Sequence, residues 1–222
     1  MEPNNVFNRT NANSHGVELS GSIYNLVIGL TLTWGFFVNW WIVKTVPVES
    51  VLSINPIIFF IAYFACCFLG IYLFTKSTNP LTSFAGYNLV VVPFGLIVNI
   101  VVSRYEPELV LDAIQVTGMV TVAMMIAGTL FPAFFKKISG ALTIALLCVI
   151  VVELIMIFFF KRDSEVIDWI VAVIFCGYIG YDWGRANSIP KTLDNAIDSA
   201  AALYMDIINL FLRILRIMGR RR

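Results

Sequence analysis

The chain has 222 residues, of which 59% are hydrophobic and only 13% are charged. Soluble domains have roughly 45–50% apolar and about 25% charged residues, and so short a chain cannot bury this much apolar surface in a soluble core. The composition therefore excludes a soluble enzyme and a disordered chain, and the net charge of +1 argues against a nucleic-acid partner.

Seven apolar segments follow one another along the chain, each close to the roughly 20 residues that a helix needs to cross a bilayer. Their approximate bounds are 22–44, 54–75, 81–103, 109–131, 138–160, 165–186 and 194–218. Prolines mark three of the predicted helix starts, at Asn55-Pro56, Asn79-Pro80 and Glu106-Pro107, because a proline at the first helical position loses no hydrogen bond. We expect Pro132 to close the fourth segment.

These segments predict an all-α integral membrane protein, a bundle of seven transmembrane helices. We expect a polar N-terminal tail over residues 1–21, the transmembrane domain over 22–219 and a basic tail over 220–222. Lys and Arg near the span ends favour a cytoplasmic N-terminus if the last segment enters the membrane and returns, and they do not decide the orientation if that segment crosses. We expect a cytoplasmic N-terminus. Only the lipid bilayer is an evident macromolecular partner, and we expect a monomer.

Ionisable side chains inside the spans are costly in hydrocarbon and therefore mark candidate functional positions. Asp168 lies near a span start and is expected at the interface as a helix N-terminal carboxylate. Glu153 lies about 12 Å inside its span, at 1.5 Å per residue, and is either functional or a buried structural carboxyl. Asp182 and Asp206 are the stronger candidates for a functional pair.

The last segment is polar along one stripe and apolar elsewhere. At about 100° per residue, seven polar side chains fall within a sector of about 120°; they are Asp194, Asp198, Asp206, Asn209, Arg213, Arg216 and Arg220. The segment is either an amphipathic helix on the membrane surface or a helix surrounded by the other six, with its stripe facing a polar pathway. Three aspartates in its first half favour the second interpretation.

Asp182 and Asp206 are expected to meet between adjacent antiparallel helices. Measured from the turn near Pro190, Asp182 lies about 12 Å deep and Asp206 about 18 Å deep. These two depths agree within the error of the predicted segment boundaries. We expect Gly177, Gly180 and Gly184 to bring these two helices close, because small residues let helix backbones approach. Two such carboxylates in a low dielectric share a proton, and with both protons lost they offer oxygen ligands to a hard cation such as calcium.

Two stretches of the chain carry a family resemblance. The run GYIGYDWGRAN, residues 177–187, followed by AAALYMDIINLFLRILRIM, residues 200–218, closely resembles the signature end of the transmembrane Bax inhibitor motif family. NPLTSFAGYNLVVVPFGL, residues 79–96, is similar to that family's third span. The seven segments also fit, so the resemblance covers essentially the whole chain.

The resemblance implies a seven-helix bundle with the C-terminal helix at its centre and the activity of a pH-sensitive calcium leak channel. The family's aspartate pair corresponds to Asp182 and Asp206. Many family members have an arginine in the second span that latches onto this pair, but residues 54–75 contain no basic residue. We therefore expect Arg213, two turns from Asp206, to take that role. The short N-terminus is typical of bacterial-type members and indicates a bacterial cell membrane.

Three functions remain open. The first is a calcium leak channel gated by Asp182 and Asp206, with Asn209, Arg213, Glu153 and Asp198 as supporting residues and calcium as the transported ion rather than a cofactor. The second is a proton-coupled secondary transporter, and the third is a non-conducting membrane interaction protein. We do not expect an enzyme, because the only histidine, His15, lies in the polar tail.

Overall fold

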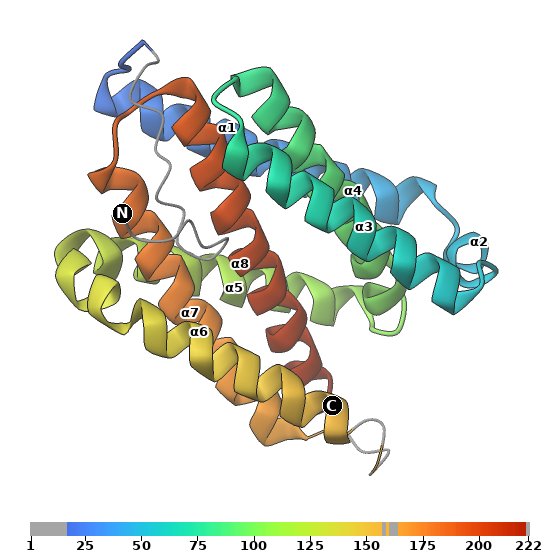
Figure 1. The fold of residues 1–222 in the computed structure, drawn as a ribbon. Helices are drawn as coiled ribbons and strands as arrows, with labels where there is room; N and C mark the ends of the chain where they lie inside the picture. The colour runs from blue at the N-terminus through green and yellow to red at the C-terminus, as the bar shows by residue number, and fades with distance from the viewer. Residues whose placement is uncertain (1–16, 157–158, 160–163, 221–222) are drawn as a thin grey trace. The chain divides into compact units, whose positions relative to one another are not determined.

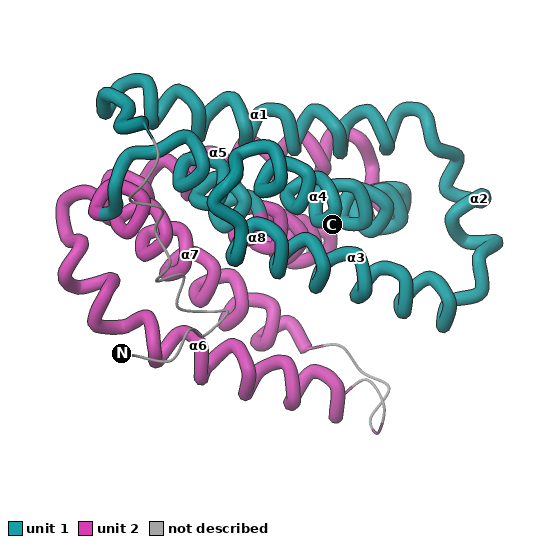
Figure 2. Tube along the Cα trace, turned by 45° about the horizontal axis from the view of Figure 1, so that its top comes forward, with its two compact units in different colours: residues 1–104, 189–204 teal, residues 105–188, 205–222 magenta. Residues whose placement is uncertain are grey.

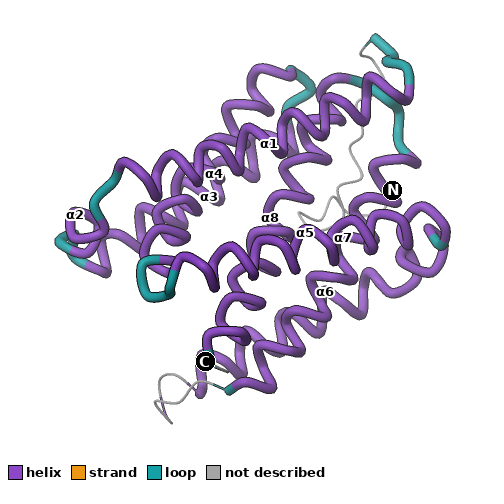
Figure 3. The backbone as a smooth tube through the Cα atoms, turned by 180° about the vertical axis from the view of Figure 1, so that it is seen from behind, coloured by secondary structure: helices purple, strands orange, loops and turns teal. Residues whose placement is uncertain are grey.

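The computed structural model describes residues 17–156, 159 and 164–220, so that most of the predicted N-terminal tail, His15 included, lies outside the described residues. The described chain forms helices joined by short loops and contains no strand (Figures 1 and 3). In order, the helices are α1 (Gly21–Thr45), α2 (Val48–Leu52), α3 (Pro56–Lys76), α4 (Pro80–Val102), α5 (Pro107–Leu130), α6 (Pro132–Ile155), α7 (Glu165–Ser188) and α8 (Leu193–Gly219).

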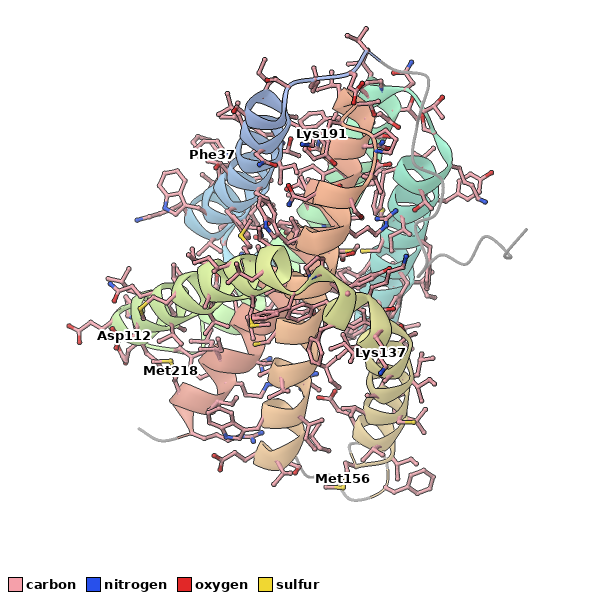
Figure 4. The ribbon with its side chains drawn as sticks, turned by 90° about the vertical axis from the view of Figure 1, so that its left-hand side faces the viewer. Phe37, Asp112, Lys137, Met156, Lys191 and Met218 are labelled. Atoms are coloured by element: carbon pink, nitrogen blue, oxygen red, sulfur yellow. The ribbon has the colours of Figure 1, made fainter. Side chains whose placement is uncertain are left out.

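Six of these helices are long and apolar enough to cross a membrane, namely α1, α3, α4, α5, α6 and α7. Large apolar side chains cover their outer surfaces; Phe37, for example, is 47% exposed and projects away from α1 (Figure 4). Such a surface needs lipid rather than water around it, so the chain is a multi-pass membrane protein. The seventh predicted segment forms α8, which is not among the six, and its crossing of the membrane stays a prediction.

Helix starts follow the predicted proline positions. Pro56 and Pro80 each occupy the first turn, and the preceding asparagine caps the helix. The side-chain oxygen of Asn55 accepts a 2.9 Å hydrogen bond from the Ile57 N–H, and that of Asn79 accepts one of the same length from the Leu81 N–H. These bonds satisfy N–H groups that a helix start leaves without an intrahelical partner, and they confirm the predicted starts.

The start of the fifth predicted segment was wrong. We expected a helix over 138–160, but α6 begins at Pro132. The preceding helix, α5, does end just before Pro132, as we expected. The turn consists of Phe131 alone, whose N–H donates to the Ala127 carbonyl at the end of α5. A proline is as well suited to begin a helix as to follow one, and Lys136 and Lys137 lie in its first two turns, where long side chains can reach the interface.

The helices gather into two compact units (Figure 2). The first contains residues 1–104 and 189–204, and within it α4 packs against both α1 and α3. Gly70 and Gly86 allow α3 and α4 to approach closely, because a Cβ on Gly70 would lie 2.5 Å from the Gly86 carbonyl oxygen. The second contains residues 105–188 and 205–222, and within it α7 packs against both α5 and α6.

The glycines of α7 do not face the helix that we expected. A Cβ on Gly177 would meet Leu142 of α6, and a Cβ on Gly180 would meet the ring of Phe135, also of α6. Gly184 faces the carbonyl oxygen of Gly128 in α5. The prediction that these glycines bring α7 close to α8 was therefore wrong: they let α7 pack tightly against α5 and α6.

Candidate functional site

Asp182 of α7 and Asp206 of α8 are both buried, with 9% and 7% of their surfaces exposed. Both belong to the second unit. Both carboxylates also lie within electrostatic range of the same group, the phenol of Tyr178, which is one turn before Asp182 on α7. Asp182 and Asp206 thus both lie near Tyr178, and their role as a proton-sharing pair stays a prediction.

Tyr178 links this region to α6. Its hydroxyl donates a 3.0 Å hydrogen bond to Oγ1 of Thr143, which in turn donates to the carbonyl of Ser139 on its own helix. The phenol proton therefore points toward α6, and the oxygen presents its lone pairs to its remaining surroundings. A change of charge on either carboxylate acts directly on a group that hydrogen-bonds to the neighbouring helix.

Asn209 and Asp198, two of the predicted supporting residues, both lie on α8. Asn209 donates from Nδ2 to the Met205 carbonyl, 2.7 Å away on its own helix. Asp198 is half-buried and belongs to the first unit, whereas Asp206 belongs to the second. Their contribution to the proposed site stays a prediction.

A cluster of five charged residues joins three helices of the second unit. Asp168 of α7 and Glu153 of α6 face Arg213 and Arg216 of α8 and Arg220, which directly follows α8. The two guanidinium nitrogens Nη1 and Nη2 of Arg213 each donate a 2.8 Å hydrogen bond to one oxygen of Glu153, and Nη1 donates a second, 2.7 Å long, to Asp168. This paired geometry is the strongest form of ion pair between side chains.

Asp168 is the anchor of this charge cluster. Its side chain is 2% exposed, and its Oδ1 accepts hydrogen bonds from Nη1 of both Arg213 and Arg216, while Nη1 of Arg220 lies 3.0 Å from Oδ2. A carboxylate this deeply buried must be paired, since an unpaired charge in such surroundings costs several kcal/mol. Asp168 lies in the first turn of α7, as expected of a helix N-terminal carboxylate, but its three arginine partners were not predicted.

Arg213 therefore has different partners from those we expected. We expected it to latch onto the aspartate pair, but its ion pairs are with Glu153 and Asp168. The sequence carried a signal for this: an arginine in an apolar helix needs a carboxylate, and Glu153 was another charge expected inside a span without an assigned partner. The separation of Arg213 and Glu153 by 60 residues hid the pairing. Glu153 lies in the last turn of α6, not well inside its span as we expected.

The N-terminal half of α8 is held in the first unit by a separate set of hydrogen bonds. Asn39 of α1 donates from Nδ2 to the Tyr204 hydroxyl, 2.7 Å away, and the hydroxyl oxygens of Tyr24 and Ser199 lie 3.2 Å apart. Ser83 of α4 donates a 2.8 Å bond to Asp194. The polar side chains in this half of α8 thus contact polar partners on two neighbouring helices.

Burial around α8 is complete over one stretch. The five consecutive residues 200–204 are each at most 1% exposed. Because successive helical residues point about 100° apart, five in a row cover every face of the helix. Protein therefore covers every face of α8 over this stretch.

Within the described residues no group of three or more His, Cys, Asp or Glu side chains gathers in a form suited to hold a metal ion.

Comparison with known proteins assigns the chain to a family. Residues 20–222 match the family Bax1-I, described as inhibitor of apoptosis-promoting Bax1. The chain belongs to this family. The match extends from the start of α1 to the end of the chain and so includes every residue of the candidate site. The resemblance to the Bax inhibitor motif family is thereby confirmed.

Proteins from distant organisms are similar in sequence to this chain. Bax inhibitor 1 of Schizosaccharomyces pombe is 32% identical over 130 residues, 56% of this chain and 47% of that protein. Protein lifeguard 4 of the mouse is 32% identical over 127 residues, 56% of this chain and 52% of that protein. The chain thus spans about half the length of these eukaryotic relatives. The inner membrane protein YbhL of Escherichia coli K12 is 26% identical over 213 residues, 89% of this chain and 88% of that protein.

Proposed function

We propose that this protein is a pH-sensitive calcium leak channel in which Asp182 and Asp206 are the gate. One observation carries the proposal: two buried carboxylates, on different helices of a membrane protein, lie within electrostatic range of the same phenol. Charged groups inside a membrane protein are retained at a cost in stability and generally serve ion or proton pathways. Membership of the Bax1-I family agrees with this proposal.

The chemistry of the pair gives the coupling between protons and cations. With one proton, two neighbouring carboxylates form a hydrogen-bonded clasp between α7 and α8. Without it, they repel each other and present oxygen ligands to a hard cation such as calcium. Protons and calcium therefore compete for the same oxygens, and the leak depends on pH.

The proposal treats α8 as the seventh helix of the bundle, at its centre. Complete burial of residues 200–204 supports this arrangement over a helix that lies on the membrane surface. The apolar outer faces of the other long helices support lipid around them. We further propose a bacterial-type protein of the cell membrane that acts as a monomer with a cytoplasmic N-terminus.

The proposal is tested by calcium flux. Protein in liposomes loaded with a calcium dye is measured across a pH series, with wild type, Asp182→Asn and Asp206→Asn compared. We expect the wild-type leak to change with pH and this pH dependence to be lost or displaced in each variant, because the remaining carboxyl group has no partner with which to share a proton. The matched control is Glu108→Gln, which removes an exposed carboxylate of α5 and should leave the wild-type profile unchanged.

Other results point to the remaining functions. A wild-type profile retained by both aspartate variants would remove the pair from the mechanism. Flux that requires a proton gradient and an added organic substrate would instead indicate a proton-coupled secondary transporter. Absence of flux at every pH, from correctly folded protein, would indicate a non-conducting membrane interaction protein.

A further inference from the structure

The five-residue charge cluster at the end of α8 carries more positive than negative charge. Arg213 is already matched, since Glu153 binds it through two parallel hydrogen bonds. One further cation would neutralise Asp168, but two are present. Nη1 of Arg216 lies 3.1 Å from Oδ1 of Asp168, and Nη1 of Arg220 lies 3.0 Å from its Oδ2. Three guanidinium groups facing two carboxylates leave one unit of positive charge, so neutralisation of the acids does not explain the third arginine.

Arg216 and Arg220 also keep unused hydrogen-bond donors. Among the described residues, both hydrogen bonds of Arg216 come from Nη1, and the ion pair of Arg220 is made by Nη1 as well. The Nε and Nη2 groups of both side chains make none of these contacts. Their side chains are 33% and 27% exposed, so the free edges of the two guanidinium groups are accessible while the buried Asp168 fixes their other edge. Two arginines held this way suit an oxyanion with several acceptor oxygens, such as a phosphate.

The cluster lies where the membrane-crossing helices end. Glu153 is in the last turn of α6, Asp168 is in the first turn of α7, and Arg216 is in the last turn of α8. Trp169, next to Asp168, is 45% exposed and donates its indole N–H to Glu165. An exposed tryptophan with a polar partner at a helix end is typical of the headgroup level of a bilayer. Phospholipid phosphates lie at this level.

We propose that Arg216 and Arg220 form a binding site for the headgroup phosphate of an anionic phospholipid. Glu153, Asp168 and Arg213 build the site by holding α6, α7 and α8 together, and the surplus charge gives it the preference for an anionic over a zwitterionic lipid. The C-terminal end of the α8 dipole also favours cations at these positions, but that effect requires neither a shared carboxylate nor two accessible guanidinium edges. The site is independent of the proposed calcium leak.

Native mass spectrometry of the full chain in detergent tests this site. Wild type is titrated with phosphatidylglycerol and separately with phosphatidylcholine, and the bound lipid is counted. We expect phosphatidylglycerol to bind more tightly, and the double variant Arg216→Gln/Arg220→Gln to lose this preference, with affinity falling about fivefold for each arginine removed. Arg104→Gln, which removes an exposed arginine near the end of α4, is the matched control and should bind like wild type.

Two further arms keep the test decisive. Arg216→Lys/Arg220→Lys retains the charge without the planar donor edge and should keep part of the preference, which separates lipid binding from misfolding of the glutamine variant. Glycerol 3-phosphate is added as a competitor. It should displace the ligand from a site for free phosphate esters but not phosphatidylglycerol from a lipid site. Equal binding of both lipids by wild type, or a preference that survives in the glutamine variant, would overturn the proposal.

Discussion

Replacing Arg213 by glutamine is expected to lower the free energy of unfolding by about 3 kcal/mol, the low end of the cost of breaking a buried ion pair. The change removes both short hydrogen bonds to Glu153 and one to Asp168. Asp168 keeps Arg216 and Arg220, which limits the loss, whereas Glu153 keeps, among the described residues, only a 3.4 Å contact with Arg216. Denaturant unfolding in detergent micelles measures the effect.

A double-mutant cycle separates this ion pair from other consequences of the substitution. Glu153→Gln combined with Arg213→Gln should be less destabilised than the sum of the two single variants, because neither charge is then left without its partner. Lys137→Gln, an exposed lysine of α6, is the control and should change stability by less than about 0.5 kcal/mol. Additive losses in the double variant would show that Arg213 and Glu153 do not act as a pair.

Gly128→Ala is expected to destabilise the protein by about 2 kcal/mol, since a Cβ at this position would meet the carbonyl oxygen of Gly180. That oxygen belongs to the backbone of α7 and cannot move aside as a side chain can, so α5 and α7 must separate. Unfolding in the same micelles measures the loss.

The same helix provides a matched control. Gly118 is also in α5, and a Cβ there would meet nothing within 4 Å. Gly118→Ala should therefore be neutral or stabilising by up to about 1 kcal/mol, as alanine is the better helix former. Equal effects at the two positions would contradict the close approach of α5 to α7.

Local signals in the sequence predicted most of the helices. Long apolar segments and asparagine-proline pairs correctly indicated where α3 and α4 begin, because both signals depend only on neighbouring residues. The start of α6 was predicted too late, at residue 138, because we expected Pro132 only to end the preceding helix, whereas it also begins α6. The five-residue α2 was not predicted, since its sequence has no long apolar run.

The candidate site was predicted in part. The stripe on the last segment correctly grouped Arg213, Arg216 and Arg220, because helical periodicity is a local property. Their partners were not predicted, since Glu153 and Asp168 lie on other helices and no spacing rule connects them to α8. The orientation of Gly180 toward α5 and α6 rather than α8 was missed for the same reason: a glycine permits a close approach but does not say to which helix.

The central claim, that Asp182 and Asp206 hold one proton in common, is tested most directly by infrared difference spectroscopy between low and high pH. The C=O band of a protonated carboxyl group is recorded for the reconstituted wild type, Asp182→Asn and Asp206→Asn. Our account predicts one such band in the wild type that is lost or displaced in each single variant, because the proton belongs to the pair. A band that persists unchanged in either variant would contradict it, since the two carboxyl groups would then titrate independently.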